Sequence, residues 1–131
     1  MNRVVARYTD GHLEKGMTLD FSPGREYFHM ESGFAENAES LTIKTMDLKA
    51  LFFVKDFDGN PVHVDKLEFE SAPPPERRRI RARFTDGEIL VGTTMGYHPG
   101  LSGFFLVPAD AESNNERCYV VTSATKEVRL I

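Results

Sequence analysis

The chain of 131 residues lacks tryptophan and has a single cysteine, Cys118. One cysteine excludes an intramolecular disulfide and fits a reducing compartment. No apolar run approaches the roughly 20 residues that a membrane-spanning helix needs. Arg3, Arg7 and Asp10 interrupt the N-terminal segment, where a secretion signal would be apolar. These absences predict a soluble, cytoplasmic protein that does not act at a membrane.

Signatures of common catalytic and metal sites are also missing. The sequence has no Cys-x-x-Cys pair, no His-x-x-x-His spacing, no glycine-rich phosphate loop and no serine elbow. The nearest approach to a metal motif is His63-x-Asp65, which ordinary surface placement explains. Cys118 lies within an expected strand and is predicted to be a buried structural thiol. We therefore expect a protein that is not an enzyme and that holds no metal and no cofactor.

A repeated pattern runs through the sequence. Ala6–Gly11 reads Ala-Arg-Tyr-Thr-Asp-Gly, and Ala82–Gly87 reads Ala-Arg-Phe-Thr-Asp-Gly. The same spacing places three further pairs in register without a gap: Gly16 with Gly92, Pro23-Gly24 with Pro99-Gly100, and Phe28 with Phe104. A coincidence would not hold register over such a length, so the pattern predicts two copies of one unit.

Each copy has the features of short β-strands. Apolar and polar residues alternate over Val4–Thr9, which is typical of a strand. The Asp-Gly pairs predict tight hairpins with primed turns, in which both residues take a positive φ. A glycine within the next strand, Gly16 or Gly92, favours a sharp bend or a close approach of another backbone.

These features predict an all-β fold of two tandem five-stranded barrels, SH3-like or Sm-like, that pack together. The first barrel is expected over residues 1–57 and the second over residues 79–131. Residues 58–78 form the linker, which contains the Pro73-Pro74-Pro75 stretch and an extended segment, Val62–Phe69, that helps to cover the seam between the barrels. The unbroken apolar run Leu51–Val54 is expected to be buried on both faces, where the barrels meet.

The main electrostatic feature is a strip of five arginines just before and within the start of the second copy. The formal net charge is −4, which argues against a general binder of polyanions, so the strip is a local exception. Clustered arginines bind phosphate groups through paired hydrogen bonds. The strip consists of Arg77, Arg78, Arg79, Arg81 and Arg83.

Two interpretations of the strip remain open. Its spacing resembles the Arg-x-x-x-Arg element of PilZ domains, which implies binding of cyclic di-GMP by Arg77 with Arg81 or by Arg79 with Arg83. The downstream Asp/Asn-x-Ser-x-x-Gly element of PilZ domains is absent. RNA is a second phosphate ligand, since the Tyr8–Gly11 hairpin resembles the hairpin of Sm-like barrels. In the other interpretation the arginines are simply the outward positions of a strand.

The whole chain resembles a family of short, uncharacterised bacterial proteins. The resemblance lies in the Tyr-x-Asp-Gly unit, in the segment Leu48–Phe57, and in the segments Gly103–Asp110 and Ser113–Asn115. It implies a role near PilZ or receiver domains in signalling proteins. We therefore expect a non-enzymatic binding or adaptor module in bacterial signalling, whose partner is another signalling protein or a small ligand. The alternative is a phosphate-ligand receptor for cyclic di-GMP or RNA that uses the strip Arg77–Arg83.

Overall fold

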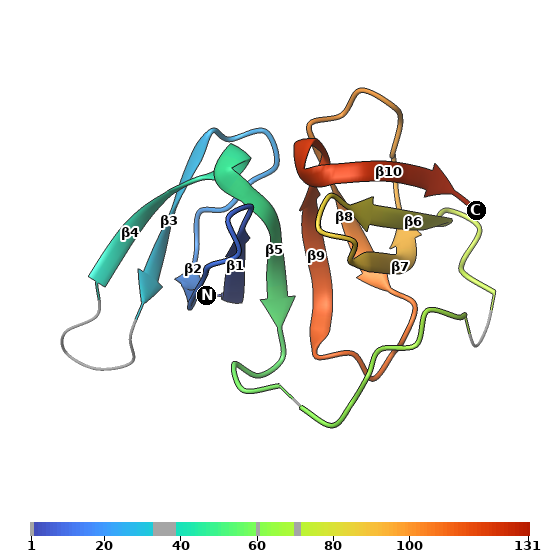
Figure 1. Ribbon diagram of the computed structural model, residues 1–131, viewed down its shortest axis with the longest axis horizontal. Coiled ribbons are helices and arrows are strands. Elements are labelled where there is room, and N and C mark those ends of the chain that lie inside the picture. The colour runs from blue at the N-terminus through green and yellow to red at the C-terminus, as the bar shows by residue number, and fades with distance from the viewer. Residues whose placement is uncertain (1, 33–38, 60, 70–71) are drawn as a thin grey trace.

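The computed structural model describes residues 2–32, 39–59, 61–69 and 72–131. These residues form ten strands and two single turns of 3-10 helix, and they include no α-helix (Figure 1). The first half contains β1 (Asn2–Tyr8), β2 (Leu13–Thr18), β3 (Tyr27–Ser32), β4 (Glu39–Lys44), η1 (Thr45–Asp47) and β5 (Leu48–Val54). The second half contains β6 (Arg78–Phe84), β7 (Ile89–Thr94), β8 (Gly103–Pro108), β9 (Asn115–Val121), η2 (Thr122–Ala124) and β10 (Thr125–Leu130). The expected all-β class is confirmed.

The ten strands belong to one antiparallel sheet, in the order β10-β6-β7-β8-β9-β5-β1-β2-β3-β4. The expectation of two separate closed barrels is therefore not met, because β5 of the first half pairs with β9 of the second half. Within each half the strands have the same order and the same antiparallel neighbours. Figure 1 shows the halves as two lobes, with β5 and β9 side by side at the centre. None of the helices in the described residues is long and apolar enough to cross a membrane.

The pairing of β5 with β9 explains why β5 is apolar apart from Lys49. Ala50 lies opposite Val120, and Phe52 lies opposite Cys118. One face of this pair packs into the core of the second half, with Ile80, Phe84 and Phe104 among its members. The other face, which includes Leu51 and Phe53, packs into the core of the first half. The prediction that Leu51–Val54 is buried on both faces at the junction is confirmed.

A charged contact adds to this apolar junction. The Lys49 ammonium lies 2.6 Å from an Asp86 carboxylate oxygen and 2.5 Å from a Glu88 carboxylate oxygen, across the two halves. The same ammonium lies 4.6 Å from the centroid of the Phe84 ring. The Lys49 side chain is only 12% exposed, so water screens this contact less than it screens an ion pair on the open surface. Lys49 therefore fixes the β6–β7 hairpin against the first half.

The two Asp-Gly hairpins differ in turn type from the expectation. Gly11 has a φ of 97° and Gly87 a φ of 94°. Only glycines take a positive φ in the described chain, so neither aspartate does, and the prediction of primed turns is wrong. The Gly11 N–H donates to the Tyr8 carbonyl, and the Tyr8 N–H donates to the His12 carbonyl. This is a three-residue loop, a type I turn followed by a left-handed glycine. The aspartate therefore needs no strained backbone.

The mid-strand glycines lie where another backbone approaches closely, as expected. A Cβ atom on Gly16 would overlap the Glu31 carbonyl oxygen, and one on Gly92 would overlap the Val107 carbonyl oxygen. Each glycine therefore lets β2 or β7 lie against the strand that follows it.

Corresponding positions in the halves carry different residues where their surroundings differ. Phe52 lies opposite Val5 in the first half, while the corresponding Arg129 lies opposite Arg81 in the second half. Phe52 is 4% exposed because the second half covers it. The Arg129 side chain is 60% exposed because β10 is the last strand of the sheet.

These two positions make a matched test of the junction. We expect Phe52→Ala to lower the free energy of unfolding by about 3–5 kcal/mol, as for other large core truncations. Arg129→Ala, a substitution at the corresponding position of β10, should change the free energy of unfolding by no more than about 0.5 kcal/mol. Urea denaturation of both variants measures the difference. Equal effects would mean that the junction is not the main apolar contact between the halves.

Candidate functional site

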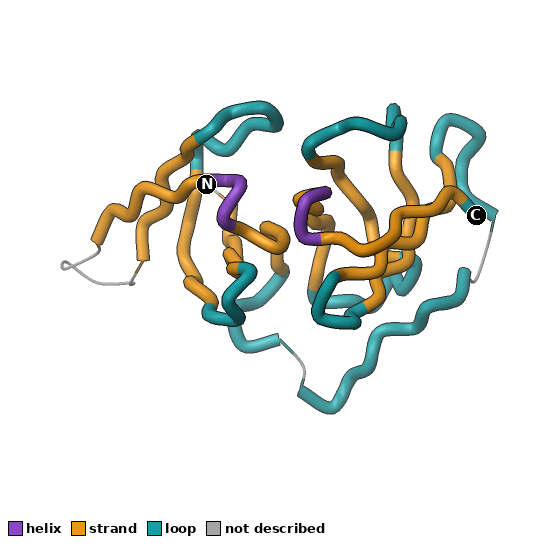
Figure 2. Tube along the Cα trace, turned by 45° about the horizontal axis from the view of Figure 1, so that its top comes forward, coloured by secondary structure: helices purple, strands orange, loops and turns teal. Residues whose placement is uncertain are grey.

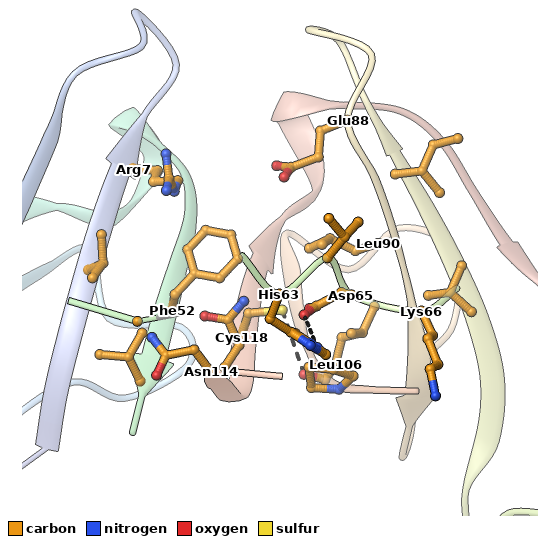
Figure 3. Close-up of a pocket in the computed structure, with 18 of the residues that line it drawn as sticks. Arg7, Phe52, His63, Asp65, Lys66, Glu88, Leu90, Leu106, Asn114 and Cys118 are labelled. Carbon is orange, nitrogen blue, oxygen red and sulfur yellow. Dashed lines mark hydrogen bonds and ion pairs between the residues drawn. The ribbon is translucent and has the colours of Figure 1, made fainter. Parts of the chain in front are cut away.

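A cleft of about 580 Å³ lies where the two halves and the linker meet. Its floor belongs to the central sheet and includes Phe52, Val54 and Cys118. Its walls come from β1 and β2 on one side, from β7 on the other, and from the linker (Figure 3). Figure 2 shows the linker passing along one side of both lobes. Ligand sites of this size commonly lie between domains and have apolar linings with a few polar groups.

Charged side chains stand on opposite walls at one end of the cleft. Arg7 extends from β1, and Glu88 extends from the β6–β7 hairpin (Figure 3). The Arg7 guanidinium carbon lies 5.7 Å from the centroid of the Phe52 ring. Lys15 also lines the cleft, and its ammonium donates a hydrogen bond of 2.8 Å to the Phe57 carbonyl, at the start of the linker. The opening is thus polar while the floor is apolar.

The linker wall is held in place by one carboxylate. Asp110 lies in the loop between β8 and β9, and its side chain is only 2% exposed. It accepts hydrogen bonds from the backbone N–H groups of Lys66 and Glu112, each at 2.9 Å. His63 Nε2 lies 2.8 Å from the same carboxylate. The N–H of Lys66 first, and then that of Glu112, lower the pKa of Asp110 to about 2.

The surroundings of Asp110 also decide what chemistry this corner can perform. His63, Asp65 and Asp110 could each offer one ligand atom to a metal ion, and these atoms lie within 4.8 Å of one another. Each is already engaged, since the Ser113 hydroxyl donates to Asp65 at 2.7 Å and His63 contacts Asp110. Ser113 donates to a carboxylate and not to a histidine, so it does not form the serine–histidine pair of a catalytic triad. These contacts tie the linker to the loop between β8 and β9, so the corner serves as an anchor for the linker.

Cys118 is buried in the floor of the cleft, as predicted. Its sulfur lies 3.6 Å from the Leu106 carbonyl oxygen. Burial raises the pKa of the Cys118 thiol, so the group stays protonated at neutral pH. A protonated thiol is a poor nucleophile and packs as a small apolar side chain.

The structure spreads the arginine strip over several environments. Arg79, Arg81 and Arg83 occupy alternate positions of β6 that face away from the core, as the outward-strand interpretation requires. Arg77 donates hydrogen bonds to the hydroxyl and the carbonyl of Thr93. Arg78 is exposed at the beginning of β6. None of the five lines the cleft between the halves.

Most outward arginines of the strip already have partners. The Arg79 guanidinium carbon lies 4.7 Å from the centroid of the Phe69 ring, in the linker. Arg81 lies 3.4 Å from Glu127, which is also 3.4 Å from Arg129. Arg81 and Arg129 lie directly opposite each other on β6 and β10. Arg79, Arg81, Arg83 and Arg129, with Glu127 among them, thus form an exposed face with more positive than negative charge, called the arginine face below.

A model of the Family of unknown function (DUF6982) matches residues 1–131. The chain belongs to this family. No curated protein and no solved structure matches the chain. The family spans the full length, as the sequence motifs indicated, and its description assigns no activity. The interpretation of function therefore depends on the cleft and on the arginine face.

Little in the sequence indicated the cleft. The pattern did indicate that Val62–Phe69 lies near the seam, and Val64, Asp65 and Leu67 of this segment do line the cleft. Val62 and Val64 are more than 80% exposed, so the segment covers less of the seam than expected. Arg7 was an ordinary polar strand position in the sequence, and Lys15 was an exception among apolar residues on one face of its strand. Only the pairing of the halves brings them to a shared site.

Asp110 makes the linker anchor sensitive to acid. Its pKa is lowered in the folded chain, so its contribution to stability is complete above the usual pKa of 3.8 and is lost as the pH falls toward 2. We expect the melting temperatures of the wild type and of Asp110→Asn to differ clearly at pH 6 and to converge between about pH 4 and pH 2. Thermal melts across this range measure the effect. Asp58→Asn, an exposed change in the same region, is the control; a difference independent of pH would contradict the anchoring role.

Proposed function

We propose that the protein is a non-enzymatic binding module whose ligand occupies the cleft between the halves. One observation carries the proposal: a concave site of about 580 Å³, apolar on its floor and polar at its opening, to which both halves and the linker contribute. The groups nearest to reactive chemistry are engaged in structural contacts, as Ser113 and Cys118 illustrate. Binding is therefore the activity that this arrangement favours.

A role in bacterial signalling fits this proposal and comes from the family resemblance. We infer that each half is a small SH3-like or Sm-like unit and that the halves arose by duplication. The shared strand order and the matching Asp-Gly hairpins support this inference. An adaptor of this kind would bring a ligand or a signalling partner to a surface formed by both halves.

A fragment screen by two-dimensional NMR tests the cleft. A mixture of small acidic, basic and neutral fragments should shift amide signals around the cleft more than elsewhere. Ile89→Glu places a charge on the cleft wall and should weaken the best neutral or acidic fragment about tenfold or more, because a charged side chain there removes an apolar contact and repels an anion. Leu19→Glu changes an apolar residue that is 73% exposed outside the cleft and should leave affinity unchanged. Shifts that cluster elsewhere would refute the cleft as the site.

A second candidate function is a phosphate-ligand receptor that uses the arginine face. The observation that favours it is a contrast between corresponding positions: Val5 and Phe52 are covered in the first half, while Arg81 and Arg129 lie on an open face in the second half. Arginines spread along two strands, and not gathered in a pocket, suit an extended strand such as RNA better than they suit cyclic di-GMP. The engagement of Arg77 with Thr93 further disfavours the Arg77–Arg81 pair as a nucleotide clamp.

Titrations with cyclic di-GMP and with single-stranded RNA at two salt concentrations test this candidate. If the face binds RNA, affinity should fall steeply with salt, because phosphate contacts release counterions. Arg81→Ala with Arg129→Ala should then weaken RNA binding and reduce the salt slope, while Lys44→Ala, at the opposite end of the sheet, should do neither. The absence of RNA binding at low salt would exclude the receptor.

A further inference from the structure

The charges that line the cleft are not equally available to a ligand. Glu88 faces the cleft, but its carboxylate is paired with Lys49 of the first half. Asp65 accepts a hydrogen bond from the Ser113 hydroxyl and lies 3.5 Å from His63. Two of the three carboxylates in the lining, Glu88 and Asp65, therefore already have partners within the protein; the third, Asp58, is exposed at the linker end.

The cations on the first-half wall, Arg7 and Lys15, have fewer partners within the protein. Within the described residues Arg7 forms no ion pair, and its guanidinium lies over the face of the Phe52 ring. Lys15 uses one of its three ammonium donors on the Phe57 carbonyl. Arg7 and Lys15 are both exposed and belong to neighbouring strands β1 and β2.

Strand register places these two cations on one face of the sheet. Lys15 lies opposite Val5 on β1, and Arg7 lies two residues further along the same strand. Side chains two residues apart on a strand, and those directly opposite on its neighbour, share a face. Phe52 is opposite Val5 on the other side of β1, so it belongs to the same face. The two cations thus border the apolar floor.

The corresponding wall of the second half lacks this arrangement. Val91 occupies the position that corresponds to Lys15, and it is buried. It lies opposite Arg81, as Lys15 lies opposite Val5. The cation pair beside an apolar floor is therefore specific to the cleft and is not a general property of the strands.

We propose that the cleft binds a small amphipathic anion, with a carboxylate or phosphate group at Arg7 and Lys15 and an apolar body against Phe52 and Val54. This proposal rests on the proposed function and names the chemistry of its ligand. The arginine guanidinium can hold either anion through two parallel hydrogen bonds, while the lysine adds a point charge. The apolar part gains affinity by displacing water from the floor.

Four probes of equal chain length separate the contributions of the head group and the apolar body. Octanoate and octyl phosphate carry an anionic head, octylammonium a cationic head, and octanol a neutral one. We expect the two anions to bind at least about tenfold more tightly than octanol, because a charge-assisted hydrogen bond is stronger than one between neutral groups. Octylammonium should bind most weakly. The two anionic probes distinguish a carboxylate site from a phosphate site.

Variants of the two cations complete the test by titration calorimetry with NMR mapping. Arg7→Gln should weaken octanoate about tenfold and leave octanol unchanged, while Arg7→Lys should retain most of the affinity. Lys44→Gln removes a cation from an exposed position of β4 and should change neither probe. The two-dimensional NMR spectrum of each variant shows whether it is folded.

The outcomes separate the two proposals. If octanol and octylammonium bind the cleft as tightly as octanoate, or if Arg7→Gln and Lys15→Gln both leave octanoate binding unchanged, the anionic ligand class is wrong while the cleft remains a binding site. If none of the four probes shifts the signals of cleft residues and the fragment screen is also empty there, the proposed function itself fails.

Discussion

The antiparallel pairing of β5 with β9 is the constraint on which the rest of the structure depends. A strand that separates two cores must be apolar on both faces, and Leu48–Val54 meets this requirement almost continuously. Alternate residues of β5 enter different cores, as Phe52 and Phe53 illustrate. The halves cannot separate without exposing both sets of side chains, so folding of one half is coupled to folding of the other. The cleft lies directly beside this pair because the two lobes diverge from it.

The same constraint explains why the sheet ends where it does. If a second copy were added to β10 by the pairing that joins β5 to β9, Glu127 would lie opposite Ile43 and Arg129 would lie opposite Leu41. Each pair would set a charged side chain against an apolar one, where β5 and β9 place Ala50 against Val120 and Phe52 against Cys118. Charged residues on edge strands commonly oppose this kind of addition. The charged residues of β10 thus disfavour such an addition, while the apolar residues of β5 and β9 join the halves.

Local features were predictable from the sequence because they depend on a few neighbouring residues. These local features include the Phe52-Phe53 run, the mid-strand glycines Gly16 and Gly92, and the alternation of the strands. The turn type was wrong because Asp-Gly is compatible with two hairpin loops, and the hydrogen bond from Gly11 to Tyr8 selects the longer one. The joining of the two halves into one sheet depends on a register between residues far apart in the chain. The cleft follows from that register, so its residues had no local signature.

The linker shows how a segment without regular structure can still define a site. Its described part forms no strand, so its position depends on individual hydrogen bonds. Asp110 supplies an anchor at Lys66, and Lys15 supplies another at Phe57. Lys15 therefore has two roles, because it fixes the linker and also faces the cleft. A ligand that draws the Lys15 ammonium away from the Phe57 carbonyl would loosen the linker at its first anchor, while Asp110 would hold the remainder in place. If a ligand binds the cleft as proposed, its binding would in this way be coupled to the position of the linker.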